Sequence, residues 1–586
     1  MKPFNRIKFS GVLIFFFLLL LLCRLAEIQL FNTESFSKHH INLIEESVKQ
    51  RTQEVMINDG RGSFTDRNGL SLTSSNEPSV ILFPFLKDYN WPESKLAEML
   101  HLPPSIIDNK LASAIKPVII GKKDGASLSK QELQEINKWK VPGLFGVLME
   151  HRPEVTQVPH IVGFTAQLPQ KLQSKYADKH LPSSVKLGAM GLEESFDEFL
   201  LPEAETKLLY HVDAIGDPLF GVNVKYIADQ SPYYPVSITT TLDKKMQSMA
   251  EKILTSDGLQ KGGLVLLDLA NNSVLAMVSK PDLKLSDKNT QHNYMLEPLT
   301  PGSVFKTVLA AAAVEDGLDD PSKSYNCDLD LYGGHNPEHK EGPLSFSESF
   351  ARSCNYTFSA IAAELIQKDP DSIERTADEL GLLSTAGWTG SVYHYQNFQQ
   401  FPHEKKGTVW SDKADKRVKK AIAQTAIGQK SVRVSPLAIA NMMATIARGG
   451  QKKEVKIVED IRYKNGTVMF HFPSQNLEGS SIDAYTAQKL QKLLRTVVTS
   501  ENGTGRKFQS LPYAVSGKSG TAETGKADAN GQSLINKWFA GYFPSDNPRY
   551  ALVVTELEVT GNKTSANQVF YDMVKEIFNS DQGHSG

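Results

Sequence analysis

The sequence lacks the marks of several common protein classes. Its 64 lysines and arginines are balanced by 66 aspartates and glutamates, for a formal net charge of −2, whereas a nucleic-acid-binding protein normally carries a basic excess. Cysteine is scarce: Cys23, Cys327 and Cys354 are too few for a disulfide scaffold and are not spaced as zinc ligands. The remaining composition, 40% hydrophobic and 22% charged over 586 residues, indicates a globular protein with more than one domain.

The two later cysteines leave two readings open. Cys327 and Cys354 could form a disulfide if the fold brings them together. We favour two separate buried thiols, because a free cysteine packs as a small hydrophobic side chain. We expect no metal site and no cofactor.

Long apolar runs are absent except near the N-terminus. Residues 11–23 (GVLIFFFLLLLLC) follow the cationic residues Lys2, Arg6 and Lys8. The run is short for a spanning helix, but the apolar residues on either side extend it to residues 9–30. Small residues suited to signal-peptide cleavage are missing near its end, so the pattern predicts an uncleaved membrane anchor.

Orientation follows from the position of the cationic residues. Positive charge before an anchor places that side in the cytoplasm. We therefore predict a cytoplasmic tail over residues 1–8, a single-pass anchor in the cell membrane over residues 9–30, and an extracytoplasmic location for the rest of the chain.

Residues 31–235 contain no cluster of candidate catalytic side chains. We expect a polar helix over residues 31–55, a strand and tight turn over 60–69, and amphipathic helices within 91–102 and 129–139. A stretch rich in proline and turn residues, 229–236 (DQSPYYPV), is typical of a linker. This part is interpreted as one mixed α/β N-terminal domain.

Residues 236–578 show a different pattern. Two buried β-hairpins are predicted, one over 263–279 and one over 537–556, with helices between them and a final helix over 566–578. Strands at both ends of the region indicate one domain whose ends share an antiparallel sheet. We expect the last residues, 579–586, to form a disordered tail.

A serine and a lysine in this region have the spacing of a nucleophile and its base. Ser303 and Lys306 follow Pro301-Gly302 and open an alanine-rich helix. A helix N-terminus favours a developing anion, and a lysine buried in apolar surroundings has a lowered pKa. The spacing alone is weak, since it recurs at Ser35 and Lys38 and elsewhere, so Ser303 could equally be a helix cap.

Two further motifs change that balance. Ser353-Cys354-Asn355 precedes an apolar helical stretch, although Ser-x-Asn is common in this chain. Lys518-Ser519-Gly520, followed by Thr521, is the only Lys-[Ser/Thr]-Gly in the sequence. Its small residues suit a strand that a ligand backbone approaches closely.

The ordered trio Ser-x-x-Lys, Ser-x-Asn and Lys-[Ser/Thr]-Gly resembles the active-site signature of penicillin-binding proteins and serine β-lactamases. The segments around the motifs are similar as well, and the upstream segments resemble the N-terminal pedestal of the monofunctional class B penicillin-binding proteins, which are peptidoglycan D,D-transpeptidases. The resembling segments are 301–306, 427–429, 435–437, 518–523 and 538–544, and upstream 61–62, 66–69 and 191–193.

The resemblance implies an α+β fold: a penicillin-binding transpeptidase domain with an antiparallel sheet and helices, on an elongated mixed α/β pedestal. It implies that Ser303 attacks a D-Ala-D-Ala peptide bond, and that the acyl group then passes to an amine of a neighbouring stem peptide. The other roles it implies are proton acceptor for Lys306, proton relay for Ser353, positioning of lysine and substrate for Asn355, carboxylate binding for Lys518 and Ser519, and substrate contact for Gly520 and Thr521.

Rival functions stay open at this point. A serine β-lactamase or a D,D-carboxypeptidase would share the fold and the first step, and a membrane-tethered β-lactam sensor or cell-wall scaffold would need no turnover. The partners implied by the resemblance are peptidoglycan stem peptides, β-lactam antibiotics and the membrane, with a membrane glycosyltransferase of the cell-wall machinery as a further partner. No nucleic acid is expected.

Overall fold

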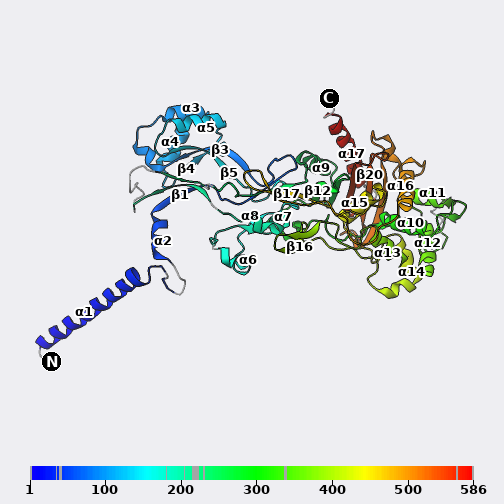
Figure 1. Cartoon of the computed structure of the whole chain (residues 1–586), viewed down its shortest axis with the longest axis horizontal. Coiled ribbons are helices and arrows are strands. Elements are labelled where there is room, and N and C mark those ends of the chain that lie inside the picture. Colours follow the sequence, from blue (N-terminus) through cyan, green and yellow to red (C-terminus); the bar gives the residue numbers. More distant parts are fainter. Residues whose placement is uncertain are drawn as a thin grey trace. The chain divides into compact units, whose positions relative to one another are not determined.

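The structure is a computed structural model (Figure 1) that describes residues 3–34, 36–37, 42–179, 181–203, 205–213, 224–228, 231–335, 340–561 and 565–583. Part of the expected linker (229–230) and the end of the expected tail (584–586) lie outside these residues.

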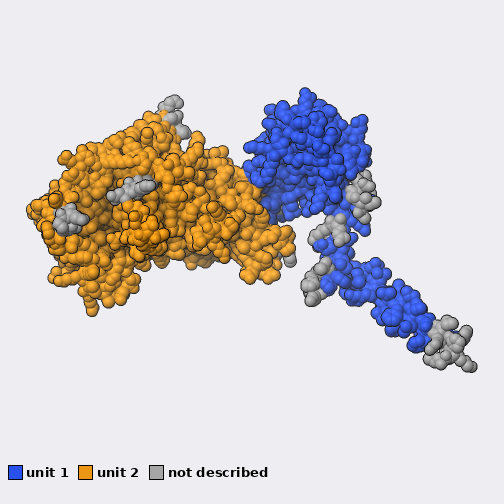
Figure 2. Space-filling model, turned by 180° about the vertical axis from the view of Figure 1, so that it is seen from behind, with its two compact units in different colours: residues 1–61, 75–151, 202–231 blue, residues 62–74, 152–201, 232–586 orange. Residues whose placement is uncertain are grey.

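The chain forms two compact units, coloured separately in Figure 2. Unit 1 comprises residues 1–61, 75–151 and 202–231, and unit 2 comprises residues 62–74, 152–201 and 232–586. The last crossing between the units lies close to the boundary expected at residue 235. Two earlier segments of the expected N-terminal domain nevertheless belong to unit 2.

Unit 1 begins with the apolar helix α1 (Pro3–Ala26), continued by a short π-helix, η1 (Glu27–Phe31). Residues 8–31 are long and apolar enough to cross a membrane: their most apolar 18-residue stretch has a mean hydropathy of 2.5, and none of that stretch is buried in the protein. The polar helix expected next is shorter than predicted: α2 spans Leu43–Gln50 and is followed by a strand, β1 (Thr52–Asn58).

Two three-stranded antiparallel sheets complete unit 1. One has the order β1-β8-β9 and the other the order β4-β3-β5, with helices around a core of leucines and isoleucines. Both predicted amphipathic helices are present, as α3 (Glu93–Leu100) and α5 (Lys130–Lys138). The other elements are β3 (Ser75–Leu82), η2 (Pro84–Asp88), α4 (Pro104–Ala112), β4 (Val118–Ile120), η3 (Lys122–Asp124), β5 (Leu144–His151), β8 (Thr206–His211) and β9 (Lys225–Ile227).

Residues 62–74 belong to unit 2 because they extend one of its sheets. Strand β2 (Ser63–Thr65) pairs in parallel with β10 (Ser237–Thr240). The sheet has the order β18-β17-β10-β2, in which β17 is Val458–Arg462 and β18 is Val468–His471. The predicted tight turn follows, closed by hydrogen bonds from Asp66 N–H to Leu70 O (2.8 Å) and from Gly69 N–H to Asp66 O (3.1 Å). A sequence pattern gives turns reliably but not the distant strand that a short segment joins.

The main sheet of unit 2 has five antiparallel strands in the order β12-β11-β21-β20-β19. Both predicted hairpins are confirmed, as β11 (Gly262–Asp268) with β12 (Ser273–Lys280) and as β20 (Ser533–Phe543) with β21 (Tyr550–Val559). β11 and β21 pair directly, so strands from the two ends of this region share one sheet, as expected. Strand β19 (Ser516–Ala527) lies at the sheet edge.

Hydrophobic cores cover both faces of this sheet. The larger core contains the buried helices α10 (Lys306–Glu315) and α15 (Pro436–Ala447), and the smaller one is formed with α9 (Lys244–Ser256) and α17 (Ser565–Gly583). In Figure 1, α15 and α17 lie close to strand β20. The last helix was predicted to end at residue 578, but α17 continues to Gly583, so most of the expected tail is helical.

The remaining elements of unit 2 are short or surround these cores. They are β6 (Thr165–Ala166), α6 (Pro169–Lys175), η4 (Ala177–Lys179), β7 (Leu187–Gly188), α7 (Gly191–Ser195), α8 (Asp197–Leu200), η5 (Lys288–Thr290), η6 (Gly302–Phe305), β13 (Ser324–Asn326), β14 (Pro343–Ser345), α11 (Phe346–Arg352), α12 (Asn355–Lys368), α13 (Ser372–Glu379), β15 (Thr389–Val392), β16 (Tyr395–Gln399), η7 (Lys413–Arg417), α14 (Lys419–Ala426), β17 (Val458–Arg462), β18 (Val468–His471), α16 (Ala484–Thr499) and η8 (Arg506–Ser510).

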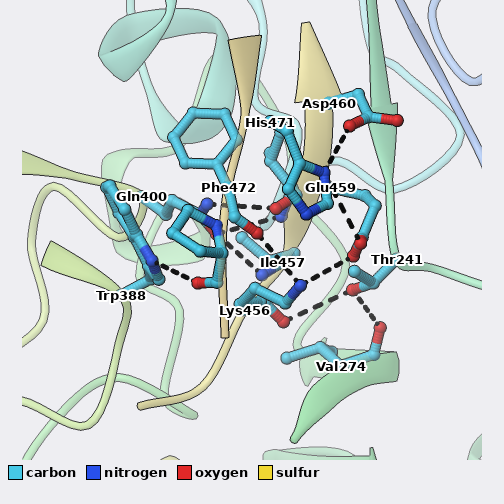
Figure 3. A network of polar contacts seen from close by, with 12 residues as sticks. Thr241, Val274, Trp388, Gln400, Lys456, Ile457, Glu459, Asp460, His471 and Phe472 are labelled. Carbon is cyan, nitrogen blue, oxygen red and sulfur yellow. Dashed lines mark hydrogen bonds and ion pairs between the residues drawn. The ribbon is translucent and has the colours of Figure 1, made fainter. Parts of the chain in front are cut away.

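A polar network centred on a buried lysine supports strand β17 (Figure 3). The Lys456 ammonium donates to the Glu459 carboxylate (2.9 Å) and to the carbonyl oxygen of Phe472 (3.1 Å). Nearby, Thr241 Oγ1 donates to Val274 O at 2.7 Å. The Gln400 side-chain amide donates to Val458 O and accepts from Val458 N–H, at the first residue of β17. Buried polar groups cost free energy unless paired, and here each named group has a partner.

Candidate active site

The candidate nucleophile lies in a tight turn pressed against strand β19. Ser303 is in η6, a single 3₁₀ turn that leads directly into α10, rather than in the first α-helical turn as predicted. Gly302 precedes it with φ of +56°, and a Cβ there would overlap the carbonyl oxygen of Thr521. Only glycine allows this approach at low cost, so the residue before the nucleophile sets its distance from the third motif.

Lys306 opens helix α10 and is wholly buried. Its ammonium donates to Ser353 O (2.6 Å), Ser353 Oγ (3.1 Å) and Asn355 Oδ1 (2.7 Å). Burial, and then the nearby positive charge of Lys518, hold the pKa of Lys306 well below its usual value. The three acceptors favour the charged form and oppose that shift, yet none of them is an anion.

The second motif is positioned by the junction of two helices. Ser353 caps the C-terminus of α11 with φ of +64°, and Asn355 is the first residue of α12. A non-glycine residue in this left-handed region is uncommon. The bend turns both the carbonyl and the side chain of Ser353 toward Lys306, as the two hydrogen bonds to its ammonium require.

The middle residue of the second motif is covalently tied. Cys354 forms a disulfide with Cys327, across 27 residues of sequence. The prediction of two separate buried thiols was wrong. The loop that leaves Cys327 returns through β14 into α11, and this return brings the two cysteines together, with a Cα–Cα distance of 6.0 Å. The spacing of the two cysteines along the chain did not predict this return.

Lys518 and Ser519 lie on the edge strand β19. Lys518 is wholly buried, its ammonium lies 5.8 Å from the centre of the Phe350 ring, and burial lowers its pKa to about 7. Ser519 Oγ donates to Thr504 Oγ1 at 2.8 Å. Gly520 packs against the backbone before the nucleophile, since a Cβ there would lie 2.7 Å from Pro301 O.

The site is therefore a buried cationic cluster. Among the described residues, neither Lys306 nor Lys518 forms an ion pair with a carboxylate, and the charge of Lys518 lowers the pKa of Lys306. Two cations without counter-ions favour an incoming anion and favour loss of a proton from one lysine. The arrangement can thus bind a carboxylate and supply a base beside a serine hydroxyl.

The structure brings the predicted residues of all three motifs into one region. Lys306, Ser353 and Asn355 are joined by hydrogen bonds, whereas Ser303 and Thr521 are neighbours through Gly302. Within the described part of the chain, the Lys306 ammonium donates to Ser353 and Asn355 and not to Ser303. Sequence reasoning missed Thr504, a residue in a glycine-rich turn that carries no motif and could not have been singled out.

Comparisons with known proteins agree with this geometry. The sequence pattern of the penicillin binding protein transpeptidase domain matches residues 262–575. The chain is 22% identical over 607 residues to the peptidoglycan D,D-transpeptidase MrdA of Acinetobacter baumannii, covering 94% of this chain and 84% of that protein. It is 23% identical over 540 residues to the stage V sporulation protein D of Bacillus subtilis, covering 84% of this chain and 73% of the relative.

The fold is also found among solved structures. A chain in a structure described as "Structural coordination of polymerization and crosslinking by a peptidoglycan synthase complex" superposes with a TM-score of 0.63 and 23% identity, covering 97% of both chains. The family predicted from the three motifs and the mixed α/β fold with antiparallel sheets are confirmed. The chain belongs to the family defined by the penicillin binding protein transpeptidase domain.

Proposed function

We propose that this chain is a class B peptidoglycan D,D-transpeptidase that cross-links stem peptides through an acyl-enzyme on Ser303. The observation that carries the proposal is the cluster of Lys306, Ser353, Asn355 and Lys518, joined to the nucleophile turn by Gly302. Membership of the transpeptidase family and similarity to MrdA support the same reaction.

Ser303, Lys306 and Ser353 together supply the nucleophile and the proton transfers that acylation needs. Ser303 Oγ forms a bond to the carbonyl carbon of the penultimate D-alanine, while the C–N bond to the terminal D-alanine breaks. The serine proton passes to Lys306, and Ser353 relays a proton to the leaving amine. An amine of a second stem peptide then attacks the ester carbonyl carbon. The new C–N bond forms the cross-link, the bond from that carbon to Ser303 Oγ breaks, and the proton lost by the amine passes to Ser303 Oγ.

Lys306 is suited to the proton-acceptor role because its charged form is disfavoured. Burial and Lys518 lower its pKa, so a larger fraction of its side chain is a neutral amine than for an exposed lysine. Ser353 and Asn355 hold the amine in place. Ser353 Oγ, at 3.1 Å, can either accept from this nitrogen or donate to it.

Substrate recognition falls to Lys518 and strand β19. The Lys518 ammonium, which donates to Ser519 O at 3.1 Å and forms no ion pair among the described residues, would bind the terminal carboxylate of the stem peptide or of a β-lactam, with Ser519 as a neutral donor. The backbone N–H groups of Ser303 and Thr521 would stabilise the oxyanion, a contribution of about 3–4 kcal/mol per donor in other acyl-transfer enzymes. Gly520 lets strand β19 lie close to the backbone that leads into Ser303.

The N-terminal region would place this chemistry at a membrane. We propose that residues 9–30 form a single-pass anchor with residues 1–8 in the cytoplasm, that residues 31–235 act as a pedestal, and that residues 236–578 form the extracytoplasmic catalytic domain. One solved structure that shares the fold is of a peptidoglycan synthase complex, which supports a membrane glycosyltransferase as a partner of this chain.

Labelling with a fluorescent penicillin, followed by mass spectrometry of the labelled peptide, tests the assignment. We expect the label on the peptide that contains Ser303, and none on a Ser303→Ala variant that melts at the same temperature. A label elsewhere, or none on the intact protein, would overturn the proposal. Prompt hydrolysis of the acyl-enzyme would instead identify a β-lactamase.

A further inference from the structure

Thr504 connects two motifs that are far apart in the sequence. It lies in the turn between α16 and η8, where the N–H groups of Gly503 and Gly505 donate to Ser500 O and Val497 O, both at 3.0 Å. These backbone bonds fold the turn onto the end of α16 and leave the Thr504 side chain exposed. The position of the residue is therefore set by the backbone and does not depend on its side chain.

Both polar groups of Thr504 are directed at the motifs. Its N–H donates to Ala351 O at 3.1 Å, and its hydroxyl lies 3.5 Å from the same carbonyl. Ala351 is in the last turn of α11, where carbonyl groups lack helical partners. The Thr504 hydroxyl oxygen also accepts a hydrogen bond from Ser519 Oγ at 2.8 Å.

We propose that Thr504 is a positioning residue for Ser519: its hydroxyl aims the Ser519 O–H and ties strand β19 to the end of the helix that carries Ser353. This inference rests on the proposed function. Thr504 does not touch the reacting atoms. It acts through Ser519, whose backbone carbonyl accepts a hydrogen bond from the Lys518 ammonium of the same motif at 3.1 Å.

The hydroxyl pair can exchange partners when a ligand binds. A serine or threonine hydroxyl carries one proton and two acceptor sites. Without ligand, Ser519 donates to Thr504, and Thr504 is oriented toward Ala351 O. When a carboxylate occupies the site, Ser519 donates to the carboxylate, and Thr504 donates its own proton to Ser519 Oγ. No hydroxyl loses its partner in either state.

A substitution that removes only the hydroxyl tests this role. Thr504→Val keeps the shape and the backbone hydrogen bond, whereas Thr504→Ser keeps the hydroxyl. We propose to measure the rate constant of acylation by a fluorescent penicillin and by its methyl ester, which lacks the carboxylate charge. The matched control is Thr499→Val, which changes an exposed threonine of α16 whose hydroxyl donates to the carbonyl oxygen of Arg495 in its own helix.

We expect Thr504→Val to slow acylation by the free acid roughly three- to ten-fold, the effect of one neutral hydrogen bond, and to leave the methyl ester rate nearly unchanged. Thr504→Ser should restore the free acid rate, and Thr499→Val should alter neither. In a Ser519→Ala background, Thr504→Val should have no further effect, because the group that it orients is gone.

Equal slowing with both ligands would overturn the proposal, since it would indicate general damage to the site; so would no slowing at all. If the melting temperature of Thr504→Val falls, the ratio of the two rate constants is measured for Thr504→Ala as a second test. Failure of the proposed function is a separate outcome, because it appears as penicillin labelling that persists in Ser303→Ala.

Discussion

Unit 2 contains two regions built around a buried lysine, and they differ in what the lysine contacts. Lys456 is 2% exposed and donates to the carboxylate of Glu459. Lys306 is 0% exposed, and its acceptors within the described part of the chain are a carbonyl, a hydroxyl and an amide oxygen. Its charged neighbour is a second lysine, Lys518, whose charge lowers the pKa of Lys306.

Under the proposed function, we expect the partner of a buried lysine, and not its burial alone, to separate a structural role from a chemical one. A carboxylate offsets the cost of burying the charge and holds the ammonium in one place. Neutral acceptors leave much of that cost uncompensated, so the proton is easier to remove. The following substitutions test this difference, in order of their expected effect on acylation.

Replacing the proposed base should have the largest effect. We expect Lys306→Gln to slow acylation by a fluorescent penicillin roughly 10²- to 10⁴-fold, the range attributed to general acid–base catalysis. Glutamine keeps a polar group near Ser353 and Asn355 but cannot take up the serine proton. Stopped-flow labelling of the folded variant measures the rate, and retention of a tenth of the normal rate would contradict the assignment.

Replacing Lys518 should weaken acylation by ligands that carry a carboxylate and should also stabilise the fold. We expect Lys518→Met to slow penicillin acylation roughly 10- to 100-fold, the effect of one charged hydrogen bond. Since burial lowers the pKa of Lys518 from 10.5 to about 7, the unfolded state binds more protons than the folded state between these pH values. Stability of the native protein therefore rises with pH across this window.

The gain in the free energy of unfolding caused by Lys518→Met should for that reason be larger at pH 6 than at pH 9. At pH 6 the native lysine is charged and buried, whereas at pH 9 its proton is already lost in the folded state. Urea unfolding at the two pH values measures the difference. A gain that is equal at both values would show that the ammonium has a partner that compensates its charge.

Removing the disulfide should have an intermediate effect on acylation. We expect the double variant Cys327→Ala and Cys354→Ala to lose about 2–4 kcal/mol of unfolding free energy, typical for a disulfide of this loop size, and to be acylated a few times more slowly, because Ser353 and Asn355 flank the lost link. Differential scanning calorimetry and labelling measure both. Cys23→Ala, which changes the cysteine in the apolar N-terminal helix, is the control.

Replacing the structural lysine should leave acylation unchanged. We expect Lys456→Met to lower the free energy of unfolding by about 1–3 kcal/mol, because the Glu459 carboxylate and the Phe472 carbonyl lose a buried donor. The folded fraction should be acylated at the normal rate. Lys413→Met, at an exposed position of η7, controls for the loss of one positive charge, and slower acylation of Lys456→Met alone would remove the distinction between the two regions.

Much of the fold and the site could be predicted, because the responsible residues are local patterns. Alternating and continuous apolar runs indicated the two hairpins of the five-stranded sheet. The three motifs indicated the residues of the candidate site, since Lys518-Ser519-Gly520 occurs once. The turn at Asp66–Gly69 could likewise be predicted from its local sequence.

What could not be predicted depends on contacts between distant segments. The disulfide forms because the chain returns through β14, and neither cysteine carries a local sign of this. Strand β2 joins unit 2 through a short parallel pairing with β10, which three residues cannot specify alone. Thr504 acts through an exposed hydroxyl in a turn, where the sequence offers only two flanking glycines.

The contact of Gly302 with Thr521 has a consequence for how such a protein can change over generations. The same glycine donates its N–H to Gly428 O at 3.1 Å, so it is enclosed by backbone on two sides. Under the proposed function, a substitution of Gly302 would displace Ser303 for an antibiotic and for the stem peptide alike, because both would react with the same serine. Tolerated variation is therefore expected at positions of the site that are not enclosed by backbone in this way.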